Sequence, residues 1–233
     1  MADASTWPAF TMIQRRLLGV LVEKSKTTPD AYPLSINALA AGSNQKSNRD
    51  PILNLTDDDV EEGLQGLMPL GLVTRITGSR VERWRHNLYE VWKVDKIELA
   101  ILAELLLRGP QTEGELRTHA TRMDPIPDLE TLRQKLKPLQ ERGLVLWLGD
   151  EGRRGAQITH GFHAPKELEA LRQRAKTLDV GPAQASPASP AIAAVPSSVE
   201  RDLAALRDEV TALKVQVQQL TNDLHTLKQS LGA

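Results

Sequence analysis

The chain has 233 residues, of which 40% are apolar and 25% charged, the balance of a globular protein. Its 29 Lys and Arg nearly equal its 30 Asp and Glu, which excludes an overall basic coat for nucleic acid but leaves room for a local basic patch. The absence of Cys excludes disulfides, thiol catalysis and Cys-ligated zinc. No apolar run reaches the ~20 residues of a membrane span, and the N-terminus lacks a signal-peptide core. We therefore expect a cytoplasmic protein without membrane contact.

The first half of the chain predicts three helices and a hairpin. A capping box begins at Thr11, and Ser35 begins a short second helix. Thr56 begins a third helix, in which four apolar side chains are expected to face inward: Val60, Leu64, Leu67 and Met68. Two predicted strands follow around a Thr-Gly-Ser turn, at residues 72–76 and 80–86.

The second half predicts the same order of elements. Asp95 begins a helix that Gly109–Pro110 ends, and a capping box at Thr112 begins a short helix. Asp128 begins a third helix with one apolar face: Leu129, Leu132, Leu136 and Leu139. Two predicted strands follow, at residues 144–148 and 156–159.

The two halves also share sequence. A Leu-x-Pro-Leu string at 67–70 and at 136–139 is followed in both by Gly-Leu-Val, after three extra residues in the second half. Because Pro usually ends a helix, we expect both third helices to end near the first Leu of the string. We interpret the likeness as an internal duplication; two unrelated three-helix units are the alternative. Three helices and a hairpin are the order of a winged helix, so the predicted fold is α+β, mainly α, with two tandem winged-helix domains: residues 1–92, and residues 93–180 with a trailing helix.

Several strings resemble the signature of the YceH family of uncharacterised bacterial proteins. The longest is Glu23 to Pro51, and the others are Gly78–Val81, Glu104–Leu116 and Arg122–Met123. The resemblance covers roughly residues 10 to 160. It implies two tandem winged-helix domains, in agreement with the pattern above, and it implies no particular activity.

A polar loop is predicted between the second and third helices of the first half. It is longer than helix connections usually are, and most of its side chains form hydrogen bonds. One interpretation is a recognition loop for phosphate, nucleic acid or a protein partner; the other is a loop whose side chains satisfy its own backbone. The candidate recognition residues are Asn44, Gln45, Lys46, Asn48 and Arg49.

The third helix of the first half is poorly suited to DNA. Five acidic residues crowd its first turns, and no Lys or Arg lies between Arg49 and Arg75. Carboxylates could bind a hard cation, but acids at a helix N-terminus are favoured by the helix dipole, and Asp59 is placed as the capping partner of Thr56. We therefore interpret these acids as structural.

The predicted hairpins, or wings, are better candidates for binding nucleic acid. Arginines on a projecting hairpin could bind backbone phosphates or enter a minor groove, although they could equally form a solvated basic strand whose alkyl stems cover the sheet edge. The candidate nucleic-acid-binding residues are Arg75, Arg80, Arg83, Arg85, Arg153 and Arg154.

Signals for catalysis are weak throughout the chain. The five His residues form no helical ligand pair, and His160-x-x-His163 lies at the end of a predicted strand. The sequence has no glycine loop that would cradle phosphate and no nucleophile elbow. We expect no enzyme, no metal site and no cofactor.

The last 53 residues predict a linker and a dimerisation helix. Residues 181–198 are rich in Pro and Ala, which indicates a semi-extended linker. Residues 199–233 repeat apolar residues at alternating spacings of four and three, the seam of a coiled coil rather than of a helix docked on its own domain. Acids at g face bases at e' in a parallel pair, so we predict a parallel homodimer, without excluding a trimer. The seam residues are Leu203, Leu206, Val210, Leu213, Val217, Leu220, Leu224 and Leu227.

These patterns predict a non-enzymatic recognition protein. The leading hypothesis is DNA-binding or a transcription-associated role, partly by analogy of fold. The alternative is a protein-interaction adaptor that uses the 44–51 loop and the acidic third helix.

Overall fold

The computed structural model describes residues 7–78, 81–153 and 155–179. The chain separates into two units, Met1–Pro182 and Ala183–Ala233, and every described residue belongs to the first. The predicted linker and coiled-coil tail therefore lie outside the described residues, as do Arg80 and Arg154. The described part is α+β and mainly helical, with two small sheets. None of its helices is long and apolar enough to cross a membrane.

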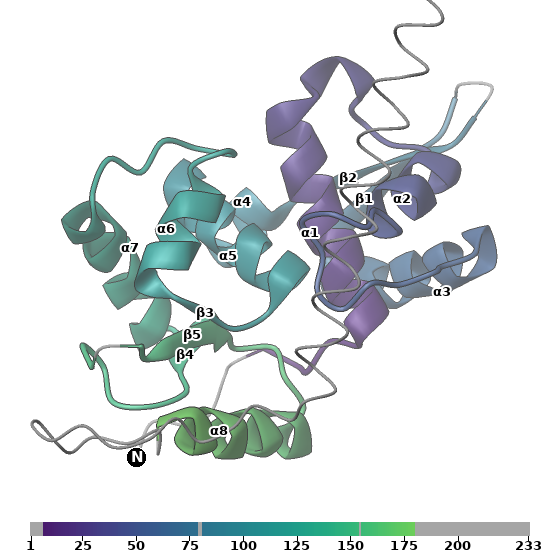
Figure 1. Cartoon of the computed structure of the whole chain (residues 1–233). Helices are drawn as coiled ribbons and strands as arrows, with labels where there is room; N and C mark the ends of the chain where they lie inside the picture. The colour runs from purple at the N-terminus through teal and green to yellow at the C-terminus, as the bar shows by residue number, and fades with distance from the viewer. Residues whose placement is uncertain (1–6, 79–80, 154, 180–233) are drawn as a thin grey trace, which may run out of the picture. The chain divides into compact units, whose positions relative to one another are not determined.

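In the first half, three helices are followed by a hairpin (Figure 1). Thr11, Ser35 and Thr56 each cap a helix as predicted, because each side-chain oxygen accepts a hydrogen bond from the backbone three residues on. The elements are α1 (Met12–Thr27), a 3₁₀ turn (Pro29–Ala31), α2 (Ile36–Ser43), α3 (Asp57–Leu67), a 3₁₀ turn (Met68–Leu70), β1 (Val73–Ile76), β2 (Arg83–His86) and the short α4 (Leu88–Trp92).

The second half has the same order of helices and a hairpin. Asp95, Thr112 and Asp128 cap its helices as predicted. The elements are α5 (Lys96–Arg108), β3 (Gln111–Thr112), α6 (Glu113–Ala120), α7 (Leu129–Glu141), β4 (Val145–Trp147), β5 (Gln157–His160) and α8 (Pro165–Asp179).

The two sheets differ by one short strand. The hairpin β1–β2 forms the first sheet, and an isolated antiparallel bridge joins Leu34 to Trp84 beside it. The second sheet has the antiparallel order β3-β5-β4. The Leu34 bridge and β3 both precede the second helix of their half and pair with its last strand. The topology of the two halves is therefore the same, with a fuller third strand in the second.

Three details of the sequence interpretation are wrong. Helix α7 does not end near Leu136 but continues through Pro138 to Glu141, and Leu139 is buried. The three extra residues before Gly143, which has a φ of 67°, leave room for this additional turn. Helix α3 does end at Leu67. Met68 and Leu129 do not face inward but are 40% and 38% exposed, since each lies at the end of its apolar face, where the core no longer covers it.

One hydrophobic core runs through both halves. Helices α1 and α5 lie at its centre, and each has an unbroken buried stretch, residues 15–23 and 98–107. They approach closely at Gly19, where an added Cβ would lie 2.7 Å from Cγ of Leu107. This contact joins the two halves, while α3 and α7 lie on opposite sides of the described body (Figure 1). The domain boundary at residue 92/93 stays a prediction.

Candidate functional site

The predicted wing arginines do not share one face. Cross-strand partners point to the same side of a sheet, and Arg75 is opposite the buried Trp84, whereas Arg83 and Arg85 alternate with it. Arg75 forms an exposed ion pair of 3.5 Å with Glu82. Arg83 donates from Nη1 to the carbonyl of Pro33 at 2.8 Å. Arg83 and Arg85 therefore lie on the face opposite Trp84, whereas Arg75, although exposed, lies on the same face as Trp84.

Arg153 lies in the second hairpin. It is exposed in the loop between β4 and β5, next to Gly152, which has a φ of 78°. It is the one candidate of that loop among the described residues.

The loop 44–51 folds inward in part: Arg49 is buried and Asn44, Gln45 and Asn48 are half-buried, while residues 46–47 and 50–51 are exposed. Asn44 closes the loop, because its side chain accepts from the backbone N–H of Leu55 and donates to the carbonyl of the same residue. The backbone N–H of Asp50 donates to the carbonyl of Leu107 at the end of α5. Of the candidate recognition residues, Lys46 is exposed, and Asn48 adopts a left-handed φ of 60°. The loop connects the first half to α5.

Arg49 is held inside this loop by every donor that it has. Nε donates to Gly42, Nη1 to the carbonyl of Asn48 and to Glu23, and Nη2 to Glu23 and Gln45. Arg49 as a whole is 6% exposed to solvent. An arginine with all five N–H groups bonded within its own chain stabilises the loop, and the same is true of Gln45, which accepts from it.

A buried charge network, which we term the junction cluster, lies where the two halves meet. Two carboxylates, from α1 and α5, alternate with three guanidinium groups. Nη2 of Arg49 lies 2.5 Å from Oε2 of Glu23, and Arg122 bridges both carboxylates, at 2.5 Å from Glu23 and 3.1 Å from Glu104. Arg108 lies 2.9 Å from Glu104. The cluster comprises Glu23, Arg49, Glu104, Arg108 and Arg122.

The pKa values of Glu23 and Arg122 favour their charged forms. Burial alone would raise the pKa of Glu23, but the hydrogen bond and charge of Arg49, with the charge of Arg122, lower it to about 2. Burial opposes the charge of Arg122 as well, yet Glu104 and Glu23 raise its pKa. The cluster is therefore a set of compensated ions that spans both halves.

The sequence interpretation did not assign Glu104, Arg108 or Arg122 to a site. Three of the strings that carry the family resemblance, 23–51, 104–116 and 122–123, nevertheless contain every member of the junction cluster. The signal was present in the sequence as separate strings, and the fold brings them together.

The exposed side of α3 is acidic, and we term its four outward carboxylates the α3 acidic face: Asp57, Asp58, Glu61 and Glu62. None of them forms an ion pair within the part of the chain that the structure describes. Asp59, by contrast, accepts from the backbone and hydroxyl of Thr56. The predicted capping role of Asp59 is confirmed, and the other acids face solvent.

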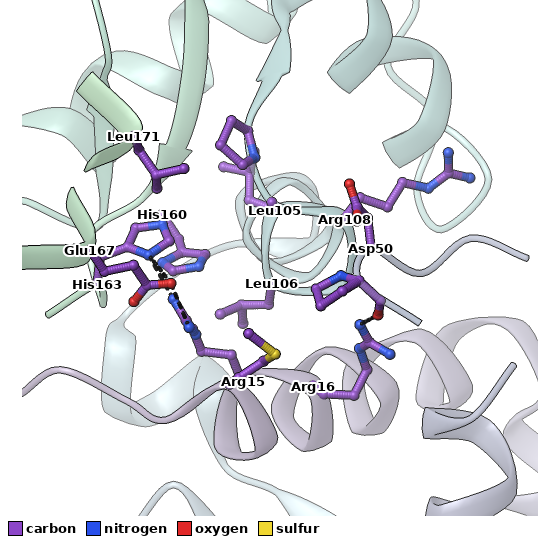
Figure 2. Close-up of a pocket in the computed structure, with 14 residues that line it drawn as sticks. Arg15, Arg16, Asp50, Leu105, Leu106, Arg108, His160, His163, Glu167 and Leu171 are labelled. Atoms are coloured by element: carbon purple, nitrogen blue, oxygen red, sulfur yellow. Dashed lines mark hydrogen bonds and ion pairs between the residues drawn. The ribbon is translucent and has the colours of Figure 1, made fainter. Parts of the chain in front are cut away.

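A cavity of about 150 Å³ lies between α1, the C-terminal end of α5 and α8 (Figure 2). At one side, Arg15 donates from Nη2 to Glu167 at 2.8 Å, and its Nη1 lies 2.6 Å from Nδ1 of His163. Nδ1 of His163 also lies 3.1 Å from Oε1 of Glu167, and Nε2 lies 2.8 Å from the hydroxyl of Thr159, so both ring nitrogens have polar neighbours. Burial lowers the pKa of His163 and, even further, that of His160.

Arg16 lines the other side of this cavity. It is 2% exposed and donates to the carbonyls of Ser43 and Pro51. Burial and the nearby Arg49 lower its pKa to about 10, while Asp50 acts in the opposite direction. Among the described residues, no three His, Cys, Asp or Glu are placed to hold a metal ion.

Comparison with known proteins identifies relatives over most of the chain. The family model described as "Protein of unknown function, DUF480" matches residues 10–152. A UPF0502 protein of Rhodopirellula baltica is 46% identical over 193 residues, which cover 80% of this chain and 81% of the relative. UPF0502 proteins of Acidovorax and Geotalea daltonii are 42% and 48% identical, over 95% and 64% of this chain and 96% and 72% of the relatives. This chain therefore belongs to the UPF0502 (DUF480) family of uncharacterised bacterial proteins, the YceH family.

Proposed function

We propose that the protein is a non-enzymatic recognition protein built from two tandem winged-helix units. The order of elements supports this fold, because each half has a helix, a strand or bridge, two helices and a hairpin whose second strand lies in the middle. Fold alone does not assign a partner, so the partner must be inferred from the exposed side chains.

The observation that carries the proposed function is the α3 acidic face. In a winged helix the third helix is the element that normally enters the major groove, and here it presents unpaired carboxylates that phosphate would repel. The same strip continues into exposed apolar side chains, Met68 and Leu70. An acidic strip with an apolar end is complementary to a basic, amphipathic protein segment. We therefore place a protein-interaction role ahead of DNA binding.

DNA binding through the wings is the second candidate. Arg83 and Arg85 point outward from β2, and Arg153 lies in the loop of the other wing. These residues could bind backbone phosphates without the third helix entering a groove.

Parallel dimerisation through the tail completes the proposal. The heptad seam lies outside the described residues, so it rests on the sequence pattern. A chain ending at Asp179 is expected to be monomeric, and Leu213→Lys with Leu220→Lys is expected to dissociate the full chain. Light scattering distinguishes these outcomes; a full-length monomer at micromolar concentration would refute the dimer.

The test of the partner class uses the full-length protein and two labelled probes, a helical Lys/Leu peptide and a mixed-sequence DNA duplex. Fluorescence anisotropy is measured from low to moderate salt. The triple variant Asp58→Asn/Glu61→Gln/Glu62→Gln is expected to lose peptide binding. A matched variant neutralises three exposed acids elsewhere, Glu130, Glu141 and Glu169, and is expected to retain it.

The outcomes separate the two candidates. Equal peptide binding by both triple variants would exclude the α3 acidic face as the binding surface. Duplex binding that weakens in Arg83→Ala/Arg85→Ala, with a smaller salt dependence, would favour the second candidate, since each lost phosphate contact lowers the log–log slope by about 0.9.

A further inference from the structure

We infer that the cavity between α1, α5 and α8 is a binding site for a small carboxylate with an apolar body. This site is independent of the α3 acidic face and of the wings. Its walls come from both halves: α1 and the loop 44–51 on one side, and the end of α5, the β5–α8 connection and α8 on the other.

The centre of the cavity is apolar. Leu105 and Leu106 come from α5, Pro110 from the turn after it, and Leu171 from α8. Met12 at the start of α1 also lines the cavity and is 44% exposed. Concave, mainly apolar surfaces with a few polar groups are typical of small-molecule sites.

The polar groups around this centre have an excess of positive charge. Three arginines line the cavity, Arg15, Arg16 and Arg108, against two carboxylates, Asp50 and Glu167. Figure 2 shows Arg15 and Arg16 on either side of Leu106, with Arg15 directed toward His163 and Glu167. Arg16 donates to the carbonyl of Pro51, next to Asp50. Burial lowers the pKa of both His residues of the wall, which disfavours their charged forms.

Arg16 distinguishes this cavity from a merely structural gap. Arg15 is paired with Glu167 and Arg108 with Glu104, but Arg16 forms no ion pair with any residue that the structure describes. Its Nε also has no hydrogen-bond partner within the described ranges, although the residue is only 2% exposed. The charge of Asp50 compensates Arg16 in part, but a buried cation without a directly paired counter-ion is costly. An anion in the adjacent cavity would compensate it.

The volume limits the ligand's size. Apolar cavities of about 150 Å³ hold a benzene ring, so the apolar part of the ligand is about that large. The class that fits is an aromatic or branched monocarboxylate, with its carboxylate at the Arg16 side and its apolar part against Leu105, Leu106 and Met12. A bare oxyanion would leave the apolar centre unfilled.

The experiment measures binding of benzoate, benzamide and inorganic phosphate to the full-length protein by calorimetry. Benzoate is expected to bind at least about tenfold more tightly than its neutral isostere benzamide, because it alone can pair with Arg16. Phosphate is expected to bind more weakly than benzoate. Met12→Trp is expected to fill the cavity mouth and weaken benzoate binding by about tenfold or more. Met68→Trp, at a site of similar exposure on the far 3₁₀ turn, is the matched control and should leave binding unchanged.

Four results would overturn the inference. Equal affinity for benzoate and benzamide would show that the site does not recognise a carboxylate. Phosphate binding as tight as benzoate binding would show that the ligand needs no apolar part. If Met12→Trp leaves benzoate binding unchanged, or if benzoate shows no saturable binding, then this cavity is not a binding site for the ligand. Arg16→Gln adds a direct test of the cation: where circular dichroism shows that this variant is folded, it should bind benzoate and benzamide alike.

Discussion

The junction cluster and the α3 acidic face are both rich in charged side chains, but the charges are buried and paired in the first and exposed to solvent in the second. In the junction cluster the side chains of Glu23, Arg49 and Glu104 are at most 3% exposed, and each carboxylate contacts at least two cations. On α3 the carboxylates face water, and no cation of the described chain pairs with them. Charged side chains therefore pair across the two halves in one place and lie exposed to solvent in the other, where we propose that a partner binds.

The third helices of the two halves show the same contrast on the surface. The basic side chains of α7 are mostly paired: Arg133 donates to both carboxylate oxygens of Glu113, and Lys135 lies 2.6 Å from Asp95. The α3 acidic face has no such partners among the described residues. A shared topology thus fixes where a helix lies but leaves its surface charge free to differ.

The largest expected effect is the loss of Arg49. Arg49→Leu removes the bidentate partner of the buried Glu23, which keeps Arg122, and leaves the loop carbonyls that Arg49 bonds without their donor, so the free energy of unfolding should fall by about 3–5 kcal/mol. Arg133→Leu removes an equally well-formed pair in which Arg133 is 52% exposed, and it should cost under about 1 kcal/mol. Urea denaturation measures both. Equal losses would mean that burial does not distinguish these pairs.

The second prediction concerns acid. Burial, opposed in part by Glu90, lowers the pKa of His86 to about 4 from an ordinary value of 6.5. Between these values the unfolded chain binds a proton that the native protein does not, so stability falls as the pH decreases from about 6.5 to 4. The contribution of His86 is about 3 kcal/mol, from the 1.36 kcal/mol of each unit.

The pH dependence of unfolding tests this. His86→Gln removes the titrating imidazole, so the free energy of unfolding should depend less on pH between about 6.5 and 4. The Gln side chain can still accept a hydrogen bond from the backbone N–H of Leu88, as Nδ1 of His86 does. An unchanged profile would assign the acid sensitivity to His160 and His163 instead. Below pH about 4.5 a further loss of stability is expected, because Glu23 takes up a proton in the unfolded chain while it stays ionised in the native protein.

Local signals in the sequence predicted the helices well. Six predicted caps were confirmed, because a cap and its partner are only three residues apart: Thr11, Ser35, Thr56, Asp95, Thr112 and Asp128. Strand β3 was missed, since two residues carry no periodicity. Pro138 misled because whether a proline ends a helix depends on the residues after it, and here three extra residues let the helix continue.

The sites depend on longer distances, and there the sequence was a poorer guide. Arg122 and Glu23 are 99 residues apart, so no pattern predicts their contact. For the loop 44–51 the sequence allows both recognition and self-satisfaction. Arg49, Asn44 and Gln45 favour the second, because their polar groups bond within the chain.

The third prediction addresses the helix contact at the junction. Gly19→Ala would place a Cβ 2.7 Å from Cγ of Leu107 and 3.3 Å from the carbonyl of Ala103. Overpacking costs about 1–3 kcal/mol, and the helix propensity of Ala returns up to about 1 kcal/mol, so a net loss of about 1 kcal/mol is expected. Gly114→Ala in α6 meets nothing within 4 Å and should be neutral or slightly stabilising. Thermal unfolding of both variants checks this, and equal stability would show that α1 and α5 can separate at no cost.

The smallest expected effect is on α3. Asp58→Asn/Glu61→Gln/Glu62→Gln removes repulsion among the carboxylates of the α3 acidic face but also loses their favourable interaction with the helix N-terminus, which is worth about 0.3–1 kcal/mol per residue in the first turn. These contributions oppose each other, and the capping pair of Thr56 and Asp59 is untouched, so the free energy of unfolding should change by less than about 1 kcal/mol. Urea denaturation at low and moderate salt measures the change. A loss as large as that of Arg49→Leu would mean that the acids stabilise the fold, and the lost peptide binding expected of this variant could then no longer be attributed to an exposed surface.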